Sequence, residues 1–239
     1  MSHLHIPDGV LPPIVWIIGM LLAGILLALS ARFTRDLGPQ RIAFQSALGG
    51  IMLAVMAIPV PITAFDYCMT LSGPVGVLLG GWGGFQVSFV VTLILALMGQ
   101  GGFTVIGLNT LVLGLGAVLA RGIYLAWVRR LGPARAMALA TAISQLVSTL
   151  IWVLMLWLSV NLTPDIAGEH EVAEGLRFLQ GGVLVSVLVP MLVAAIALES
   201  LLAYGLARFL SRVRPDLLPA VLGVDPTAPA AASRLSGPR

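Results

Sequence analysis

Long apolar runs separated by short polar segments dominate this chain. The runs cover residues 14–31, 42–62, 72–82, 84–99, 104–128, 134–160 and 183–209. Several reach the roughly 20 residues that a helix needs to cross a bilayer core of about 30 Å. Because the lipid core offers no hydrogen-bond partners, a spanning backbone must be helical or closed into a barrel. The pattern predicts an all-α, polytopic transmembrane bundle of about seven helices.

The stretch between residues 73 and 100 is the ambiguous part of this pattern. It is long for one helix and short for two, and the sequence GGWGG at 80–84 divides it. Glycine disfavours helix interiors. We therefore expect two helices here, so that the chain crosses the membrane three times between residues 66 and 129.

Charged residues predict the orientation of the bundle. The chain is 59% hydrophobic and 10% charged, and all thirteen basic residues are Arg. Arginine clusters follow the runs at 14–31, 104–128 and 183–209, whereas acidic residues gather in the alternate loops. The positive-inside rule then places the arginine loops and the C-terminus in the cytoplasm and the N-terminus outside. We expect a multi-pass membrane protein.

Three parts of the chain follow from this topology. Residues 1–13 are an extracytoplasmic segment, and residues 14–214 are the transmembrane domain. Residues 215–239, rich in Pro, Ala and Ser without periodicity, are expected to be a disordered cytoplasmic tail.

Two histidines lie next to the amino terminus, directly ahead of the first run. An α-amine, a deprotonated backbone amide and an imidazole can surround Ni²⁺ or Cu²⁺ in a plane. His3 would supply the ring if Met1 is retained or if Ser2 becomes the first residue, and His5 if translation begins at position 4. Asp8 would either orient the His5 ring or close an Asp-Gly turn. A frayed, solvated terminus is the alternative.

Two charged residues and one amide lie inside the predicted spans. Arg121 and Glu199 lie roughly 10 and 15 Å from the cytoplasmic ends of their helices, at about 1.5 Å per residue. Because an isolated charge at this depth is costly, we predict that the two side chains form an ion pair. The alternative is that Arg121 snorkels to the headgroups. Asn109 is expected to bond across helices near the outer side.

Small residues in the first run are spaced for close helix contact. Four of them form two pairs, each four residues apart: Gly19 and Ala23, and Gly24 and Ala28. Such spacing places both members of a pair on one helical face. Either these residues pack inside the chain, or their surface docks a separate membrane subunit.

Several kinds of chemistry have no motif in this sequence. It contains no glycine-rich phosphate loop ending in Lys-Ser/Thr, no paired-histidine helix motif and no Cys-x-x-Cys. We therefore expect no ATP site and no enzymatic activity. The arginines lie mainly in the loops predicted to be cytoplasmic, so they do not indicate nucleic-acid binding. A membrane scaffold or an intramembrane enzyme is an alternative of a different class, although the spans lack the polar pairs that catalysis needs.

Four segments carry a family resemblance: residues 5–13 (HIPDGVLPP), 54–61 (AVMAIPVP), 99–114 (GQGGFTVIGLNTLVLG) and 197–205 (ALESLLAYG). In order and spacing they resemble the cobalt/nickel substrate-capture (S) components of energy-coupling-factor (ECF) ABC transporters, of the CbiM/NikM type. The first and third segments are the more specific. The resemblance implies a seven-helix membrane subunit, with an outside N-terminus, that captures Ni²⁺ or Co²⁺ for uptake.

The resemblance also implies a ligand set, from which this chain departs. In that family the amino group, the second residue's amide and its imidazole bind the metal, and a loop histidine completes the plane. His5 matches the second residue, but the loop at 63–73 contains no histidine. Candidate fourth ligands are the sulfur of Cys68 or Met69, the carboxylate of Asp66 and the imidazole of His170. Sulfur would favour softer ions such as copper.

The resemblance implies partners and leaves one alternative open. An S component works with a membrane coupling (T) subunit and two ATPase subunits, and a small accessory membrane subunit is compatible with it. Because the loop histidine is missing, the alternative is an S component of the same fold with another metal or a small organic nutrient as substrate.

Overall fold

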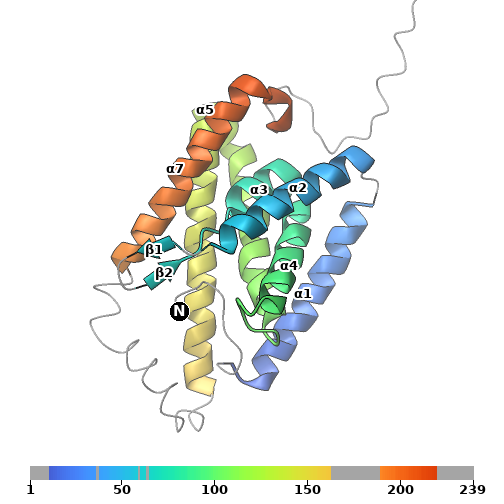
Figure 1. Cartoon of the computed structure of the whole chain (residues 1–239), viewed down its shortest axis with the longest axis vertical. Coiled ribbons are helices and arrows are strands. Elements are labelled where there is room, and N and C mark those ends of the chain that lie inside the picture. The colour runs from blue at the N-terminus through green and yellow to red at the C-terminus, as the bar shows by residue number, and fades with distance from the viewer. Residues whose placement is uncertain (1–10, 36–37, 59, 63–64, 163–188, 220–239) are drawn as a thin grey trace, which may run out of the picture.

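The computed structural model describes residues 11–35, 38–58, 60–62, 65–162 and 189–219. Within these residues lie six α-helices: α1 (Pro13–Phe33), α2 (Pro39–Met56), α3 (Ser72–Leu79), α4 (Gly81–Leu97), α5 (Ile106–Leu162) and α7 (Val189–Val213). Figure 1 shows them gathered in one bundle, with α1 along one side and α7 along the other. The predicted all-α class is confirmed.

Three of the described helices are long and apolar enough to cross a membrane. They are α1, the Ile106–Met155 part of α5, and α7. The outer face of α1 leaves large apolar side chains exposed, among them Ile14, Leu21 and Ile25. Because exposed apolar surface of this extent is unfavourable in water, α1 presents a face suited to lipid.

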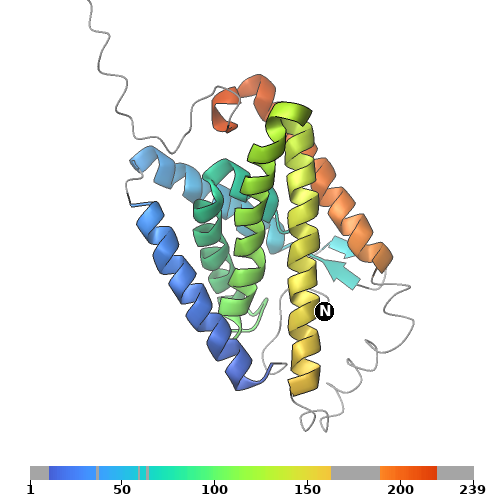
Figure 2. The same ribbon diagram turned by 180° about the vertical axis from the view of Figure 1, so that it is seen from behind.

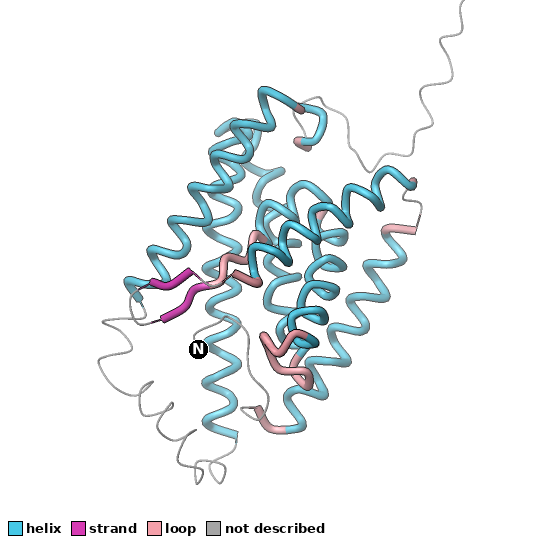
Figure 3. The backbone as a smooth tube through the Cα atoms, in the orientation of Figure 1, coloured by secondary structure: helices cyan, strands magenta, loops and turns pink. Residues whose placement is uncertain are grey.

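The second apolar run does not stay helical to its end. The prediction of one helix over 42–62 is wrong, because α2 ends at Met56 and the chain then forms the strands β1 (Val60–Ile62) and β2 (Phe65–Tyr67). The two strands pair antiparallel and are magenta in Figure 3. Prolines at positions 59 and 61 explain the change, because proline has no amide hydrogen and disfavours helix in the residue before it.

The helices α3 and α4 divide at Gly80, as the glycine-rich stretch predicted. Gly80 has φ 80° and ψ 146°, a conformation that residues with a side chain rarely adopt. The expectation that both helices cross the membrane is wrong for α3, since eight residues rise only about 12 Å. All eight residues of α3 are buried, so this short helix forms the centre of the bundle.

The helix α5 is bent into two arms. Gly132 has φ 76° and ψ 166°, and Pro133 follows it, so residues 106–131 and 133–162 form separate helical arms where two runs were predicted. Figure 2 shows the arms descending from a common turn. Ser148 of the second arm donates a hydrogen bond to the Val112 carbonyl of the first at 2.8 Å, which joins the arms inside the bundle.

The ordered domain continues past the predicted boundary at residue 214. A 3₁₀ turn, η3 (Pro215–Leu217), follows α7, and Leu218 is buried against a core cluster that includes Tyr124 and Met137. The expected tail therefore does not begin at residue 215, and residues 220–239 lie outside the described part.

Candidate functional site

Glu199 on α7 is a fully buried carboxylate. Its Oε1 accepts a hydrogen bond from the backbone N–H of Thr70 at 2.8 Å. Its Oε2 accepts one from the Thr70 hydroxyl at 3.2 Å and another from the side-chain amide of Gln145. A buried carboxylate is tolerated where donors converge on it in this way. The segment before α3, the second arm of α5 and α7 therefore meet at Glu199.

The Thr70 hydroxyl is the centre of this buried network. While it donates to Glu199, its oxygen accepts from the Gln145 amide at 2.7 Å and from the Ser72 backbone N–H at 3.4 Å. Thr70, Ser72 and Gln145 are all buried. The side-chain oxygen of Gln145 is buried without a hydrogen-bond partner, so it can accept a hydrogen bond from another donor.

Residues 68–72, which we call segment 68–72, connect β2 to α3 through this network. Leu71 has φ 50° and ψ 14° and is the one non-glycine residue in the described ranges with a positive φ. Such a backbone costs about 1–3 kcal/mol and persists only where neighbouring contacts hold it. At the start of the segment, Cys68 is buried and Met69 is half-buried.

Two arginines bind the C-terminal end of α3. Arg121 Nη1 donates to the Val77 carbonyl at 2.8 Å, and Arg41 Nη2 donates to the Leu79 carbonyl at 3.3 Å. The last carbonyls of a helix have no partner within it and carry its negative dipole end. The two guanidinium groups therefore stabilise a helix end that lies away from water.

This arrangement corrects the predicted ion pair between Arg121 and Glu199. Arg121 binds near the end of α3, at Val77, whereas Glu199 binds Thr70, just before its start. Roughly 10 Å of helix separates the two positions. In the contacts that the structure describes, both charges are stabilised by hydrogen bonds with neutral groups.

The structure describes only part of the predicted ligand set. Four of the candidates lie outside the described residues: His3, His5, Asp8 and His170. Asp66 lies in β2, where its backbone pairs with Pro61, and its side chain is not described. In the described ranges no three His, Cys, Asp or Glu side chains gather as a metal-binding group.

Asn109 and two of the small residues of α1 are buried inside the bundle. Asn109 is buried in the first turns of α5. Gly19 and Ala23 face inward, and a side chain at position 19 would overlap that of Leu108. Gly24, by contrast, is exposed with open space around it.

The predicted docking stripe is thus divided. Gly19 and Ala23 pack inside the chain, which corrects their assignment to a docking surface. Gly24 and Ala28 remain exposed, and docking through these two residues stays a prediction.

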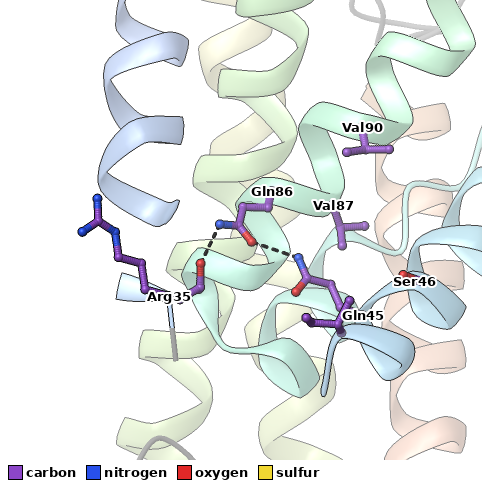
Figure 4. A pocket seen from close by; sticks show the side chains of 8 residues that line it. Arg35, Gln45, Ser46, Gln86, Val87 and Val90 are labelled. Carbon is purple, nitrogen blue, oxygen red and sulfur yellow. Dashed lines mark hydrogen bonds between the residues drawn. The ribbon is translucent and has the colours of Figure 1, made fainter. Parts of the chain in front are cut away.

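An open groove of about 410 Å³ lies between the end of α1, α2 and α4. A chain of hydrogen bonds crosses it (Figure 4): Gln86 donates to the Thr34 hydroxyl at 2.7 Å, and Gln45 donates to the Gln86 side-chain oxygen at 3.0 Å. The groove contains no candidate metal ligand. Its polar chain ties three helices together at one end of the bundle.

Sequence reasoning missed Thr70 and Gln145 as site residues. Gln145 had a visible signal, since it is an amide inside the apolar run 134–160, and buried amides are usually hydrogen-bonded. Thr70 had none, because a threonine in a loop is ordinary. Its importance comes from the approach of α7, which only the fold reveals.

Comparisons with known proteins agree on one family. Residues 5–217 match the family CbiM, described as "Cobalt uptake substrate-specific transmembrane region". The chain is 25% identical over 237 residues to the "Cobalt transport protein CbiM" of Geobacter sulfurreducens, covering 97% of this chain and 66% of that protein. The chain therefore spans just under two thirds of this relative's length.

Solved structures show the same fold. The crystal structure of a truncated transition metal transporter has a TM-score of 0.71 at 18% identity, covering 87% of this chain and 99% of that one. A second transition metal transporter has a TM-score of 0.70 at 18% identity, covering 87% and 93% of the two chains. At this identity the likeness establishes the fold alone.

Proposed function

We propose that this chain, which belongs to the CbiM family of cobalt uptake substrate-specific transmembrane regions, is the membrane subunit that captures a divalent transition-metal ion, Co²⁺ or Ni²⁺, at its outer face. The observation that carries the proposal is the extent of the family match. It begins at His5 and ends at residue 217, so it includes the amino-terminal motif, segment 68–72 and the whole of α7. The family is a transport component and not an enzyme.

The proposed ligand set combines the amino terminus with segment 68–72. The terminal amine, a backbone amide and the imidazole of His5, or of His3 in the alternative start, would supply three nitrogens. For the fourth position we favour Cys68 over Met69 and Asp66. Cys68 is buried where Met69 is half-buried, and it begins a segment held by hydrogen bonds. Thiolates are strong transition-metal ligands.

Transport would need further subunits. The sequence has no Walker phosphate loop, which supports an assembly with a membrane coupling subunit and two ATPases that supply the energy, as in ECF transporters. The exposed Gly24 and Ala28 on α1 are candidate contacts for the coupling subunit. The subunit would lie in a bacterial or archaeal plasma membrane.

A second candidate function keeps the fold and changes the substrate. The loop at 63–73 has no histidine but contains Cys68 and Met69. A sulfur ligand favours softer ions over nickel and cobalt, so another transition metal is the alternative.

The experiment that tests the proposal is a measurement of intact mass and metal content on the full chain, purified in lipid nanodiscs and loaded with Co²⁺ or Ni²⁺ at pH 8. We expect one equivalent of metal and a mass that identifies the mature first residue. Alanine in place of the histidine that the mass assigns to the site, His5 or in the alternative start His3, should abolish binding, whereas His170→Ala should not. A chain that stays empty with both ions but takes up a softer ion would favour the second candidate.

A further inference from the structure

Glu199 lies outside the proposed ligand set, so its burial calls for a separate explanation. Its carboxylate accepts hydrogen bonds from two parts of the chain other than its own helix: segment 68–72 and the second arm of α5. A buried carboxylate is stable only while such donors stay in place. Glu199 therefore fixes α7 relative to both partners.

Segment 68–72 depends on this anchor. The left-handed Leu71 is held from its N-terminal side by Thr70, which binds Glu199 through both its backbone N–H and its hydroxyl. From the C-terminal side, the Ser72 N–H binds the same hydroxyl. Without the carboxylate, Thr70 would lose both contacts to α7, and the strained backbone would relax.

The hydrogen bonds between Thr70 and Glu199 also restrict the position of Cys68. It stands two residues before Thr70, is buried, and is the single cysteine of the chain. Groups that orient a metal ligand without touching the metal alter affinity about 10–100-fold when they are removed. An anchored backbone next to a thiol ligand is such a group.

We propose that Glu199 and Gln145 are positioning residues, which hold segment 68–72 so that the Cys68 sulfur faces the captured metal ion. This inference rests on the proposed function and on Cys68 as its fourth ligand. Both side chains act through Thr70, and neither binds the metal.

The chain offers a matched set of variants. Glu199→Ala leaves the Thr70 backbone N–H without its acceptor and removes one of the two acceptors of the Gln145 amide, the other being the Thr70 hydroxyl oxygen. Glu199→Gln keeps the network, because the Gln145 amide can rotate so that its unpartnered oxygen accepts from the new amide group. Ser200→Ala is the control on the same helix, since that hydroxyl donates to the Ile196 carbonyl of α7 itself at 2.6 Å.

The first readout is the rate at which a maleimide labels Cys68 in metal-free chain in nanodiscs. Because the chain has one cysteine, the label reports on segment 68–72 alone. Glu199→Ala should raise the rate about tenfold by favouring local opening. Glu199→Gln and Ser200→Ala should label at the wild-type rate. Equal rates for wild type and Glu199→Ala would overturn the inference.

The second readout is a Co²⁺ titration followed through the sulfur-to-metal charge-transfer absorption. Wild type should show the band, Glu199→Ala should bind Co²⁺ about 10–100-fold more weakly, and Glu199→Gln should restore both affinity and band. If Glu199→Ala does not fold, Thr70→Val, which removes the hydroxyl and keeps the backbone N–H bond to Glu199, should also weaken Co²⁺ binding, by a smaller factor.

The outcomes separate the inference from the proposed function. Unchanged Co²⁺ affinity in both Glu199→Ala and Thr70→Val overturns the inference alone. So does a wild-type chain that binds Co²⁺ without a sulfur band. A wild-type chain that binds neither Co²⁺ nor Ni²⁺ contradicts the proposed function, and the inference falls with it.

Discussion

The backbone of Ala117 in α5 occupies the space that a side chain on Gly76 in α3 would need. A methyl group at position 76 would overlap the Ala117 carbonyl oxygen and lie 2.6 Å from its Cα. Because the obstacle is backbone, it cannot move aside as a flexible side chain would. The absence of a side chain at Gly76 thus allows α3 to lie directly against α5.

Gly76→Ala should therefore destabilise the bundle, although alanine is the better helix former. Overpacking typically costs about 1–3 kcal/mol, and here it would force two helices apart. The matched control is Gly122→Ala on α5, where nothing lies within 4 Å of the added carbon, so a gain of up to about 1 kcal/mol is expected. Thermal unfolding of both variants in nanodiscs gives the comparison, and equal shifts would contradict it.

Arg121 and Glu199 should contribute independently to stability. Because their described contacts lie at opposite ends of α3, the losses from Arg121→Ala and Glu199→Ala should add to within about 0.5 kcal/mol in the double variant. Unfolding free energies of the four chains of this cycle provide the measurement. A coupling above about 1 kcal/mol would reinstate the ion pair that the sequence suggested.

Cys68→His should shift the metal preference. If Cys68 is the fourth ligand, histidine in its place completes an all-nitrogen plane, which suits Ni²⁺ better than the softer ions that sulfur prefers. The ratio of Ni²⁺ to Cd²⁺ affinity, measured by competition in the full chain, should rise. Met69→Leu should leave the ratio unchanged, and a shift in that control instead would assign the ligand to Met69.

The ion pair that follows α7 predicts a small dependence of stability on pH. Arg214 donates to Asp216 at 2.9 Å, and this hydrogen bond holds the pKa of the Asp216 carboxyl below its ordinary value. A lowered folded-state pKa means that the stabilisation is present above the unfolded-state pKa and is lost as the pH falls through the folded-state pKa. Both side chains are exposed, so the contribution is slight.

Asp216→Asn should accordingly lower the melting temperature slightly at neutral pH. The difference from wild type should vanish once the pH lies below the lowered pKa of Asp216, and also in high salt, which screens exposed charges. A difference that persists in acid would assign the effect to packing of η3.

The long apolar helices could be predicted from the sequence. The runs that became α1, the arms of α5 and α7 are long and apolar, and their period and length are local properties. The break at Gly80 was also predictable, because glycine has a specific backbone role there. The β1–β2 hairpin was not predicted, although prolines occur at positions 59 and 61. The apolar character of residues 42–62 indicated a helix that continues through them.

The site was harder to predict than the fold. Glu199 and Arg121 were recognised as unusual, but charge attraction alone suggested that they pair. Their described partners are backbone groups and neutral polar side chains, which carry no charge signal in the sequence. Gly19 and Ala23 show a related limit, since small residues have the same spacing whether they pack inside a chain or against a partner.

The capped end of α3 has a mechanical consequence. In water, the last carbonyls of a helix are solvated from any direction, and the helix is free to turn or shift. Here Arg41 of α2 and Arg121 of α5 replace the solvent at Leu79 and Val77, and they approach from two separate helices. A movement that draws α2 away from α5 would strip a carbonyl of its donor in an apolar environment. The two guanidinium groups thus act as a brace, so that α2, α3 and α5 should move as one rigid unit.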